Sequence, residues 1–290
     1  MGPFFIQFPH PGGEGGPDRS GWAKAGEAHV RKFMRAAGRF RRSAEGPDEV
    51  GEIGFWAEWE ADSVCVQTPD GLGGGYPAFV HRPLPPDRER QPRLPQNTDP
   101  FVFAGAFLYT FCRQDRYRAL KSLDRGSVIV FGSKLHGAFV CDTVFVVAKA
   151  IQHTGRTWRE RLADFVPAVF LETTIGPMYA AMTRRDHPYT LYFGATPETA
   201  VDGTFSFFPC LPIAEGANGF GRPALRDLRG INPRNAQGVA FNKGIPHQEF
   251  PTCWRAVVER VHDAGCYLGI EAALSAENSV LSTTGAASCE

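Results

Sequence analysis

The sequence of 290 residues carries no excess charge, because 31 lysine and arginine side chains are balanced by 31 aspartate and glutamate side chains. A basic excess would have indicated a nucleic-acid partner. The overall charge therefore does not indicate what kind of partner the protein binds, although a local basic face can still contact phosphate. The hydrophobic fraction of 43% excludes a disordered or fibrous chain. We expect one elaborated domain over residues 1–275 and a weakly ordered tail of small, polar residues over 276–290.

Long apolar runs are also missing. No segment reaches the roughly 18 apolar residues that indicate a membrane helix. The residues from Met1 to Phe8 carry no charge and are followed by Pro9, so they do not resemble a secretory signal. We therefore predict a cytoplasmic protein without a membrane partner, and no obligate protein partner is evident.

The motifs that hold metals and nucleotides are absent too. The seven cysteines include no C-x-x-C pair and the eight histidines include no H-E-x-x-H pair, so we predict neither a metal nor a cofactor. A G-x-G-x-x-G or Walker A motif after a strand is missing as well. This argues against nicotinamide and nucleoside-triphosphate enzymes.

The patterns that are present are mostly those of strands. Strands are predicted over residues 4–8, 52–67, 190–195, 204–209 and 266–271, and a hairpin over 126–148 with its turn at 133–137. Helices are predicted over 22–40 and 254–261, the second ending at Gly265, and a proline-rich loop over 68–95. Because strands outnumber helices and do not alternate with them, we predict an α+β fold. Its sheet should be curved or barrel-like and mainly antiparallel, with flanking helices.

The predicted helix over 22–40 is the most basic element of the chain. Helical spacing places Arg31, Lys32 and Arg35 within about one and a half turns, mostly away from the apolar face. We predict that these three residues contact nucleic-acid phosphate, with Ser133 and Lys134 of the hairpin turn as further contacts. A solvated helix face is the alternative interpretation.

A polar quartet, Gln96-Asn97-Thr98-Asp99, stands directly before Pro100 and an apolar run. Amides can read the hydrogen-bonding edge of a base, and a carboxylate can orient water or stabilise a developing cation. We predict Asp99 as the catalytic carboxylate, with Asn97 and Gln96 beside it. The alternative is a turn that leads into a strand.

Asp142 and His10 are the next catalytic candidates. A period of two puts Asp142 on one strand face with Val140 and Val144, where a carboxylate is costly unless it is paired or catalytic. A salt bridge to a neighbouring strand, or an exposed outer face, are the alternatives. His10 lies in a glycine-rich loop after a strand, a common place for general acids, although a lone loop histidine is usually structural. Glu58 raises the same question as Asp142, and it can also be an edge residue.

The hairpin residues 126–133 and 138–144 resemble the barrel signature of PUA-like domains, including the ASCH and EVE groups. This resemblance implies a protein that binds RNA or modified bases. A wider set, residues 8–12, 96–101, 193–196 and 205–207, resembles a bacterial family associated with nucleotide modification and phage defence. That resemblance implies a DNA glycosylase acting on glucosylated hydroxymethylcytosine in phage DNA.

A further segment, Gly230-Ile231-Asn232-Pro233, is similar to the water-activating loop of mismatch-type uracil-DNA glycosylases. The segment His10-Pro11 is similar to the histidine loop of the same enzymes. In this chain, however, the two loops come in the reverse order, and Arg234 stands where a glycine is expected. We therefore do not assign that architecture.

Two functions follow from the sequence. In the first, the protein is a monofunctional DNA glycosylase that flips a modified base out of the duplex and excises it with water. Phage DNA with modified cytosine is then its partner. In the second, the protein is a non-catalytic PUA-like reader of modified bases or nucleotides, which needs a pocket and a basic face but no positioned carboxylate.

Overall fold

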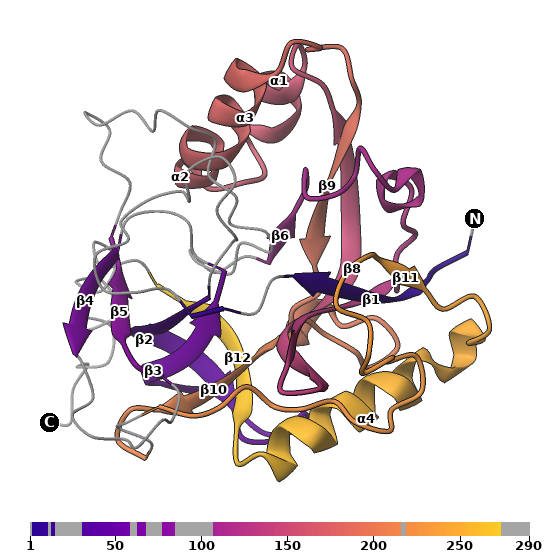
Figure 1. The fold of residues 1–290 in the computed structure, drawn as a ribbon. Helices are drawn as coiled ribbons and strands as arrows, with labels where there is room; N and C mark the ends of the chain where they lie inside the picture. Colours follow the sequence, from indigo (N-terminus) through magenta and orange to yellow (C-terminus); the bar gives the residue numbers. More distant parts are fainter. Residues whose placement is uncertain are drawn as a thin grey trace, which may run out of the picture.

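The computed structural model describes residues 2–10, 13–14, 31–58, 63–67, 77–84, 107–215 and 219–273. Within this part of the chain, the strands form two six-stranded sheets (Figure 1). One hydrophobic core contains residues from both sheets, such as Phe8 and Phe131 of the first and Phe55 and Phe208 of the second. The two sheets are thus held together by shared burial of aromatic side chains.

The first sheet has the strand order β11-β1-β7-β8-β9-β6. Its strands are β1 (Phe5–His10), β6 (Leu108–Tyr109), β7 (Val128–Leu135), β8 (Ala138–His153), β9 (Tyr189–Gly194) and β11 (Ala240–Phe241). The strand β1 runs parallel to β7, and the other neighbours are antiparallel. The long strand β8 extends from the hairpin with β7 to the helices around α1 (Figure 1).

The second sheet has the order β12-β10-β3-β2-β5-β4. Its strands are β2 (Lys32–Arg41), β3 (Glu49–Ala57), β4 (Ser63–Gln67), β5 (Val80–Pro83), β10 (Phe208–Pro212) and β12 (Tyr267–Ala272). The last strand, β12, also pairs with β2, so that β2, β3, β10 and β12 form a closed four-stranded barrel. Closure removes the free strand edges of these four elements.

Two glycines allow the strands of the closed barrel to pack closely against one another. A Cβ atom at Gly38 of β2 would lie 2.4 Å from the carbonyl oxygen of Glu271 and 2.5 Å from Cδ1 of Ile53. A Cβ atom at Gly269 of β12 would lie 2.2 Å from Cε2 of Phe208. Such distances are too short for any side chain, so only glycine lets the barrel close here.

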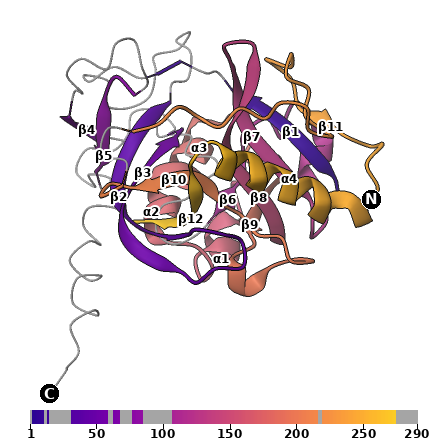
Figure 2. The same ribbon diagram turned by 90° about the horizontal axis from the view of Figure 1, so that it is seen from below.

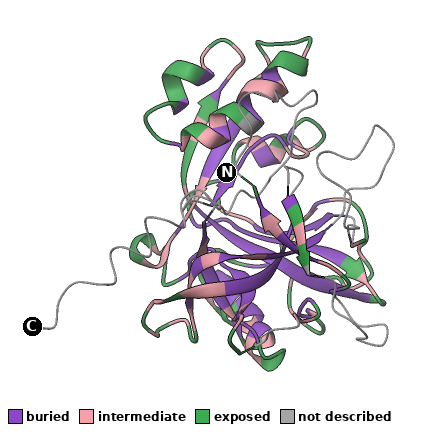
Figure 3. Ribbon diagram, turned by 90° about the vertical axis from the view of Figure 1, so that its left-hand side faces the viewer, coloured by how far each residue is buried: buried purple, intermediate pink, exposed green. Residues whose placement is uncertain are grey.

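Four α-helices flank the sheets in the described part of the chain: α1 (Trp158–Leu162), α2 (Ala168–Phe170), α3 (Gly176–Ala181) and α4 (Phe250–Asp263). The longest, α4, lies along the first sheet (Figure 2) and buries Trp254, Val257 and Val261 in a second apolar cluster with β1, β7 and β8. The burial pattern shows buried strands inside and exposed helix faces outside (Figure 3). None of the described helices is long and apolar enough to span a bilayer.

The predicted fold class is confirmed, since two of the eleven strand pairings in the described residues are parallel and the other nine are antiparallel. The predicted hairpin is confirmed as β7–β8. Its turn residues His136 and Gly137 have φ values of 48° and 78°, as the two-residue turns favoured in hairpins require. The predicted C-terminal helix is confirmed as α4, and Gly265 has the left-handed φ of 75° expected after a helix end.

The predicted helix over 22–40 is wrong where the structure describes it, because residues 32–41 form the strand β2; its first part, 22–30, lies outside the described residues. From Met34 to Arg41 the buried and partly exposed residues alternate with a period of two, and Phe40 is buried while Arg39 and Arg41 face outward. The apolar residues of this segment fit the helical period of 3.6 as well as the strand period of two. The segment forms a strand because it pairs with β3 and β12. Gly38 in the middle also disfavours a helix.

Other predicted boundaries are corrected in smaller ways. The strand expected over 52–67 is two strands, β3 and β4, and the loop expected over 68–95 contains β5. The strand expected over 204–209 begins later, at Phe208, because Phe207 instead bonds to Val144 of β8. The predicted tail, 276–290, lies outside the described residues.

Candidate functional site

A group of charged and polar side chains lies buried where the ends of β1, β7 and β8 meet the beginning of the barrel. We call it the buried charge cluster; its members are His10, Arg31, Glu58, Ser133, Asp142 and Arg222. Each is at most 9% exposed. Charged residues are rarely buried unless they are paired, so the arrangement of these six decides what the site can do.

Strand register brings the cluster together. His10, the last residue of β1, is the Cα partner of Ser133 in the parallel pair β1–β7. In the antiparallel pair β2–β3, Lys32 is opposite Ala57, which places Arg31 and Glu58 opposite each other one step further on. Strand pairing thus places the cation Arg31 and the anion Glu58, which flank β2 and β3 of the barrel, at the end of the first sheet.

A β-bulge aims Asp142 at this cluster. In the β7–β8 ladder Phe131 pairs with Thr143 and the next residue, Gly132, pairs with Cys141, so Asp142 is the extra residue. Bulges commonly redirect a side chain next to functional sites. The expectation that Asp142 shares the face of Val144 is therefore wrong: Val144 packs in the apolar cluster under α4, whereas Asp142 contacts Arg31 and Ser133.

Asp142 is held by two guanidinium groups. Its Oδ2 atom lies 2.9 Å from Nε of Arg31, and its Oδ1 atom lies 3.2 Å from Nη1 of Arg222. The hydroxyl of Ser133 donates to Oδ2 at 3.1 Å and accepts from Arg222 at 3.0 Å. Burial opposes ionisation of Asp142, but the two arginines outweigh it and hold the pKa of this carboxyl below its ordinary value.

Arg31 joins both carboxylates. Its Nη1 atom lies 2.9 Å from Oε2 of Glu58, on the side opposite the contact with Asp142. Burial disfavours the charged guanidinium, but Glu58 and Asp142 together raise its pKa above the ordinary value. Arg31 is therefore a fixed positive charge inside the protein and cannot lie on an exposed phosphate-binding face.

His10 is the titratable member of the cluster. Its Nδ1 atom is hydrogen-bonded to Oε2 of Glu58, and its Nε2 atom lies 3.3 Å from Sγ of Cys112. Burial, the largest effect, lowers the pKa of His10 below 6.5; Glu58 raises it, and the charges of Arg31 and Arg113 lower it further. The imidazole is therefore neutral at pH 7, with one ring nitrogen fixed by a carboxylate.

A second polar group is buried at the start of β2. The ammonium of Lys32 donates to Oγ of Ser63 at 2.8 Å, and Ser63 is 3.3 Å from Nδ1 of His81. All three residues are buried, Lys32 with an exposed fraction of 1%. Lys32 is therefore also withdrawn from the surface on which phosphate contacts were expected.

The described basic residues Arg35, Arg39 and Arg41, all in β2, are engaged by acids. Arg35 pairs with Glu52 at 2.5 Å, Arg39 pairs with Asp48 at 2.7 Å, and Arg41 shares Asp48. Of the two predicted contacts in the hairpin turn, Ser133 is buried in the charge cluster and Lys134 is exposed at the hairpin end of β7. The basic run therefore forms ion pairs across the outside of the barrel, and little of its charge is left for a ligand.

Of the predicted catalytic residues, the structure brings His10 and Asp142 together through Arg31 and Glu58. The three predicted residues Gln96, Asn97 and Asp99 lie outside the described residues. Glu58 is a member of the cluster and not an edge residue. Arg222 and Cys112 were missed, because neither stands in a local sequence pattern. Arg222 contacts Asp142, which is 80 residues away along the chain, and Cys112 contacts His10, which is 102 residues away.

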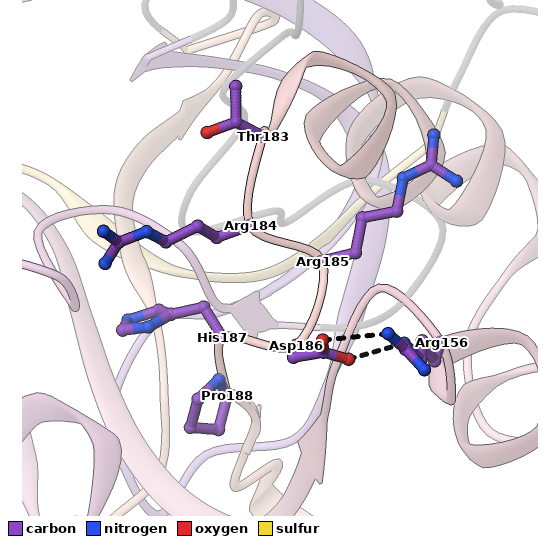
Figure 4. A pocket seen from close by; sticks show the side chains of 7 residues that line it. All are labelled: Arg156, Thr183, Arg184, Arg185, Asp186, His187 and Pro188. Atoms are coloured by element: carbon purple, nitrogen blue, oxygen red, sulfur yellow. Dashed lines mark hydrogen bonds and ion pairs between the residues drawn. The ribbon is translucent and has the colours of Figure 1, made fainter.

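A separate basic pocket lies at the turn between α3 and β9 (Figure 4). Its volume is about 640 Å³ and it is lined by Arg156, Thr183, Arg184, Arg185, Asp186, His187 and Pro188. Arg156 is bound to Asp186 at 2.6 Å, while Arg184 and His187 extend to one side of the turn and Arg185 to the other (Figure 4). Arg184 and Arg185 are exposed, so they can reach a ligand in solvent.

Neither the family models, nor the curated proteins, nor the solved structures include a match to this chain. In the part of the chain that the structure describes, no group of three or more histidine, cysteine, aspartate or glutamate side chains could hold a metal ion.

Proposed function

We propose that this protein is a DNA glycosylase that hydrolyses the N-glycosidic bond of a modified base in phage DNA. The observation that supports the proposal is the buried pair of His10 and Glu58 at the end of β1. A neutral imidazole whose Nδ1 proton is held by a carboxylate leaves Nε2 as a base. Such a base can take a proton from water as the water attacks the sugar.

The two carboxylates of the cluster have different roles in this proposal. Asp142 is neutralised by Arg31 and Arg222, so it is a positioning residue that fixes the arginines. Glu58 is shared between one arginine and His10, so part of its charge can stabilise the imidazolium that forms when His10 takes a proton. Asp99 stays the predicted partner of the oxocarbenium-like sugar, and Asn97 and Gln96 the predicted amides beside it.

Phosphate contact is assigned in this proposal to the basic pocket. The cations of β2 are buried or paired with acids, whereas Arg184 and Arg185 are exposed beside one another along the chain. Exposed arginines hold a phosphate backbone without reading its sequence. The pocket therefore replaces the expected basic helix as the phosphate-contacting surface.

The test is incubation with duplex DNA that carries normal, hydroxymethylated or glucosylated cytosine, followed by alkali to cleave abasic sites. We expect strand breaks with one modified duplex and none with normal cytosine. The variant His10→Gln removes the base and should abolish breakage. His136→Gln changes an exposed histidine in the β7–β8 turn and should leave breakage unchanged.

Binding to a modified duplex without release of a base would instead support the alternative, a PUA-like reader. The closed barrel is compatible with either function, since a fold does not determine chemistry. Absence of both binding and release with all three duplexes would refute the proposal.

A further inference from the structure

The thiol of Cys112 occupies the position in front of the His10 base. Its Sγ atom is 3.3 Å from Nε2, within hydrogen-bonding distance for sulfur. Cys112 follows β6 by a short turn, whose position is fixed by the hydroxyl of Tyr109 donating to the carbonyl oxygen of Cys112 at 2.9 Å. Cys112 is a partly exposed residue, unlike the buried cysteines Cys141, Cys210, Cys253 and Cys266.

The direction of the protons follows from the partners of His10. Ionised Glu58 can only accept a hydrogen bond, so Nδ1 of His10 carries the proton and Nε2 carries the lone pair. The lone pair faces the thiol of Cys112, which donates to it. Hydrogen bonds thus connect the nucleophile Cys112 to the base His10 and the base to the orienting carboxylate Glu58. This arrangement activates a weak nucleophile.

A donor without a partner lies next to these three residues. Nη1 of Arg113, the residue after Cys112, is buried and has no hydrogen-bond acceptor among the described residues. The guanidinium lies 5.4 Å from the ring centre of Phe8, two residues before His10, and its charge acts on His10. A buried N–H group that lacks an acceptor is costly, and an oxygen of a bound ligand would satisfy it. The φ value of Arg113, 58°, is unusual for a residue with a side chain.

We propose that Cys112, His10 and Glu58 form a catalytic triad that attacks the carbonyl carbon of an ester, thioester or amide. Cys112 is the nucleophile, His10 is the base, Glu58 is a positioning residue, and Arg113 receives the oxyanion. The inference goes beyond the proposed function, because it holds whether or not the protein excises a base.

The step balances with water as the only further reactant. The proton of the thiol passes to Nε2 of His10, Sγ bonds to the carbonyl carbon, and the carbonyl electron pair moves to oxygen beside Arg113. The carbon–oxygen double bond re-forms and expels the alcohol, thiol or amine, which takes the proton from His10. Water then repeats the sequence and releases a carboxylic acid and the free thiol.

The first measurement is the rate at which iodoacetamide alkylates each cysteine of the intact chain, followed by mass spectrometry at pH 6.5 and pH 8.5. Cys65 of β4 is also partly exposed and serves as the internal control. An unassisted thiol with a pKa of about 8.5 should gain roughly fiftyfold in rate over this range. We expect Cys112 to gain less than about threefold, because neutral His10 takes the proton of the thiol during the attack at both pH values, so the rate does not depend on free thiolate.

Variants separate the triad from simple exposure. His10→Gln should return Cys112 to the steep pH profile, and Glu58→Gln should shift the profile while leaving Cys65 unchanged. Each variant is first checked for the thermal transition and circular dichroism of the wild type. If His10→Gln does not fold, Arg113→Gln, at a partly exposed position, tests the same centre through acylation.

The second measurement uses p-nitrophenyl acetate as the acyl donor. We expect a burst of one p-nitrophenolate per chain and an acetyl group on Cys112, with both lost in Cys112→Ser and the burst slowed at least tenfold in Arg113→Gln. A gain of roughly fiftyfold for Cys112, as expected for an unassisted thiol, or no acetyl group on it, would overturn the triad. Failure of base release from DNA bears only on the glycosylase, since neither measurement contains DNA.

Discussion

Asp142 is the single side chain whose replacement should cost most. Asp142→Asn keeps the shape of the side chain but leaves Arg31 and Arg222 buried without their shared anion. Breaking a buried pair in this way typically costs about 3–5 kcal/mol. We expect a loss of this size in urea unfolding at pH 7.

The matched control for this change is Asp186→Asn. Asp186 also binds an arginine, Arg156, but both side chains are more than two-thirds exposed, at 71% and 74%. Exposed pairs contribute about 0–1 kcal/mol. Equal losses in the two variants would contradict the buried ion pairs described for Asp142.

His153 should make stability depend on pH. Burial lowers its pKa to about 3, and its two nitrogens contact the hydroxyls of Tyr179 at 2.8 Å and Thr110 at 3.1 Å. The folded protein therefore binds the proton more weakly than the unfolded chain, whose value is near 6.5. Above pH 6.5 His153 therefore does not lower the free energy of unfolding. Below pH 6.5 that free energy falls by about 1.4 kcal/mol per pH unit because of this group.

Urea unfolding at pH 7.5, 6.0 and 5.0 measures this dependence. His153→Gln cannot take up the proton, so its stability should fall less steeply than that of the wild type over the same range. The exposed His136 is the control, and His136→Gln should keep the wild-type slope. A wild-type slope in His153→Gln would contradict the assignment.

At this same scale the sequence predicted some site residues and missed others. A carboxylate among valines and a histidine after a strand are locally unusual, which is why Asp142 and His10 could be found. Arg222 and Cys112 have ordinary surroundings in the sequence, and only folding brings them to partners 80 and 102 residues away. Arg31 was found for the wrong reason, as a surface cation, because local sequence does not reveal burial.

Among the elements, β2 is the strand on which the barrel depends, since it pairs with β3, β5 and β12. Gly38 of β2 and Gly51 of β3 are Cα partners, and they offer a matched pair of substitutions. An added Cβ atom would lie 2.4 Å from the carbonyl oxygen of Glu271 at Gly38, but 3.9 Å from Phe40 at Gly51. The first position is overpacked by a single methyl group and the second is not.

We expect Gly38→Ala to destabilise the protein by about 1–3 kcal/mol or more, because backbone cannot move aside as a side chain can. Gly51→Ala should change stability by less than about 0.5 kcal/mol. Thermal unfolding followed by circular dichroism gives both values. If Gly51→Ala were the more damaging of the two, the described closure of the barrel by β12 would be wrong.

The elements also show where sequence patterns suffice. Strands with a clear period and a two-residue turn, such as β7 and β8, could be predicted together with their turn. The strand β2 could not, because its apolar residues satisfy the helical and the strand period equally well. Tertiary pairing with β12, which lies about 230 residues later, made the choice, as the register of Arg39 with Glu271 shows.

For the whole molecule, the distribution of charge matters more than its sum. If the protein contacts DNA through the basic pocket, the double variant Arg184→Gln and Arg185→Gln should weaken binding at low salt. The slope of log affinity against log salt should fall by about 1 for each arginine that contacts a phosphate. Fluorescence anisotropy with a labelled duplex at several salt concentrations measures both effects.

The control removes the same charge elsewhere. Arg226 and Arg234 are also exposed, and they lie outside the pocket residues. Arg226→Gln together with Arg234→Gln should leave the salt slope within error of the wild type. Equal effects of the two double variants would show that net charge, and not the pocket, governs binding.

The closure of the barrel by β12 also sets the order of events during synthesis. The strand β2 leaves the ribosome early, but its partner β12 follows only at residues 267–272. Until then β2 and β10 each expose an edge that can pair with another nascent chain, and strands joined over such distances form slowly. We therefore expect a protein that ends before Tyr267 to be captured by chaperones or to aggregate, even though all members of the buried charge cluster have already been made.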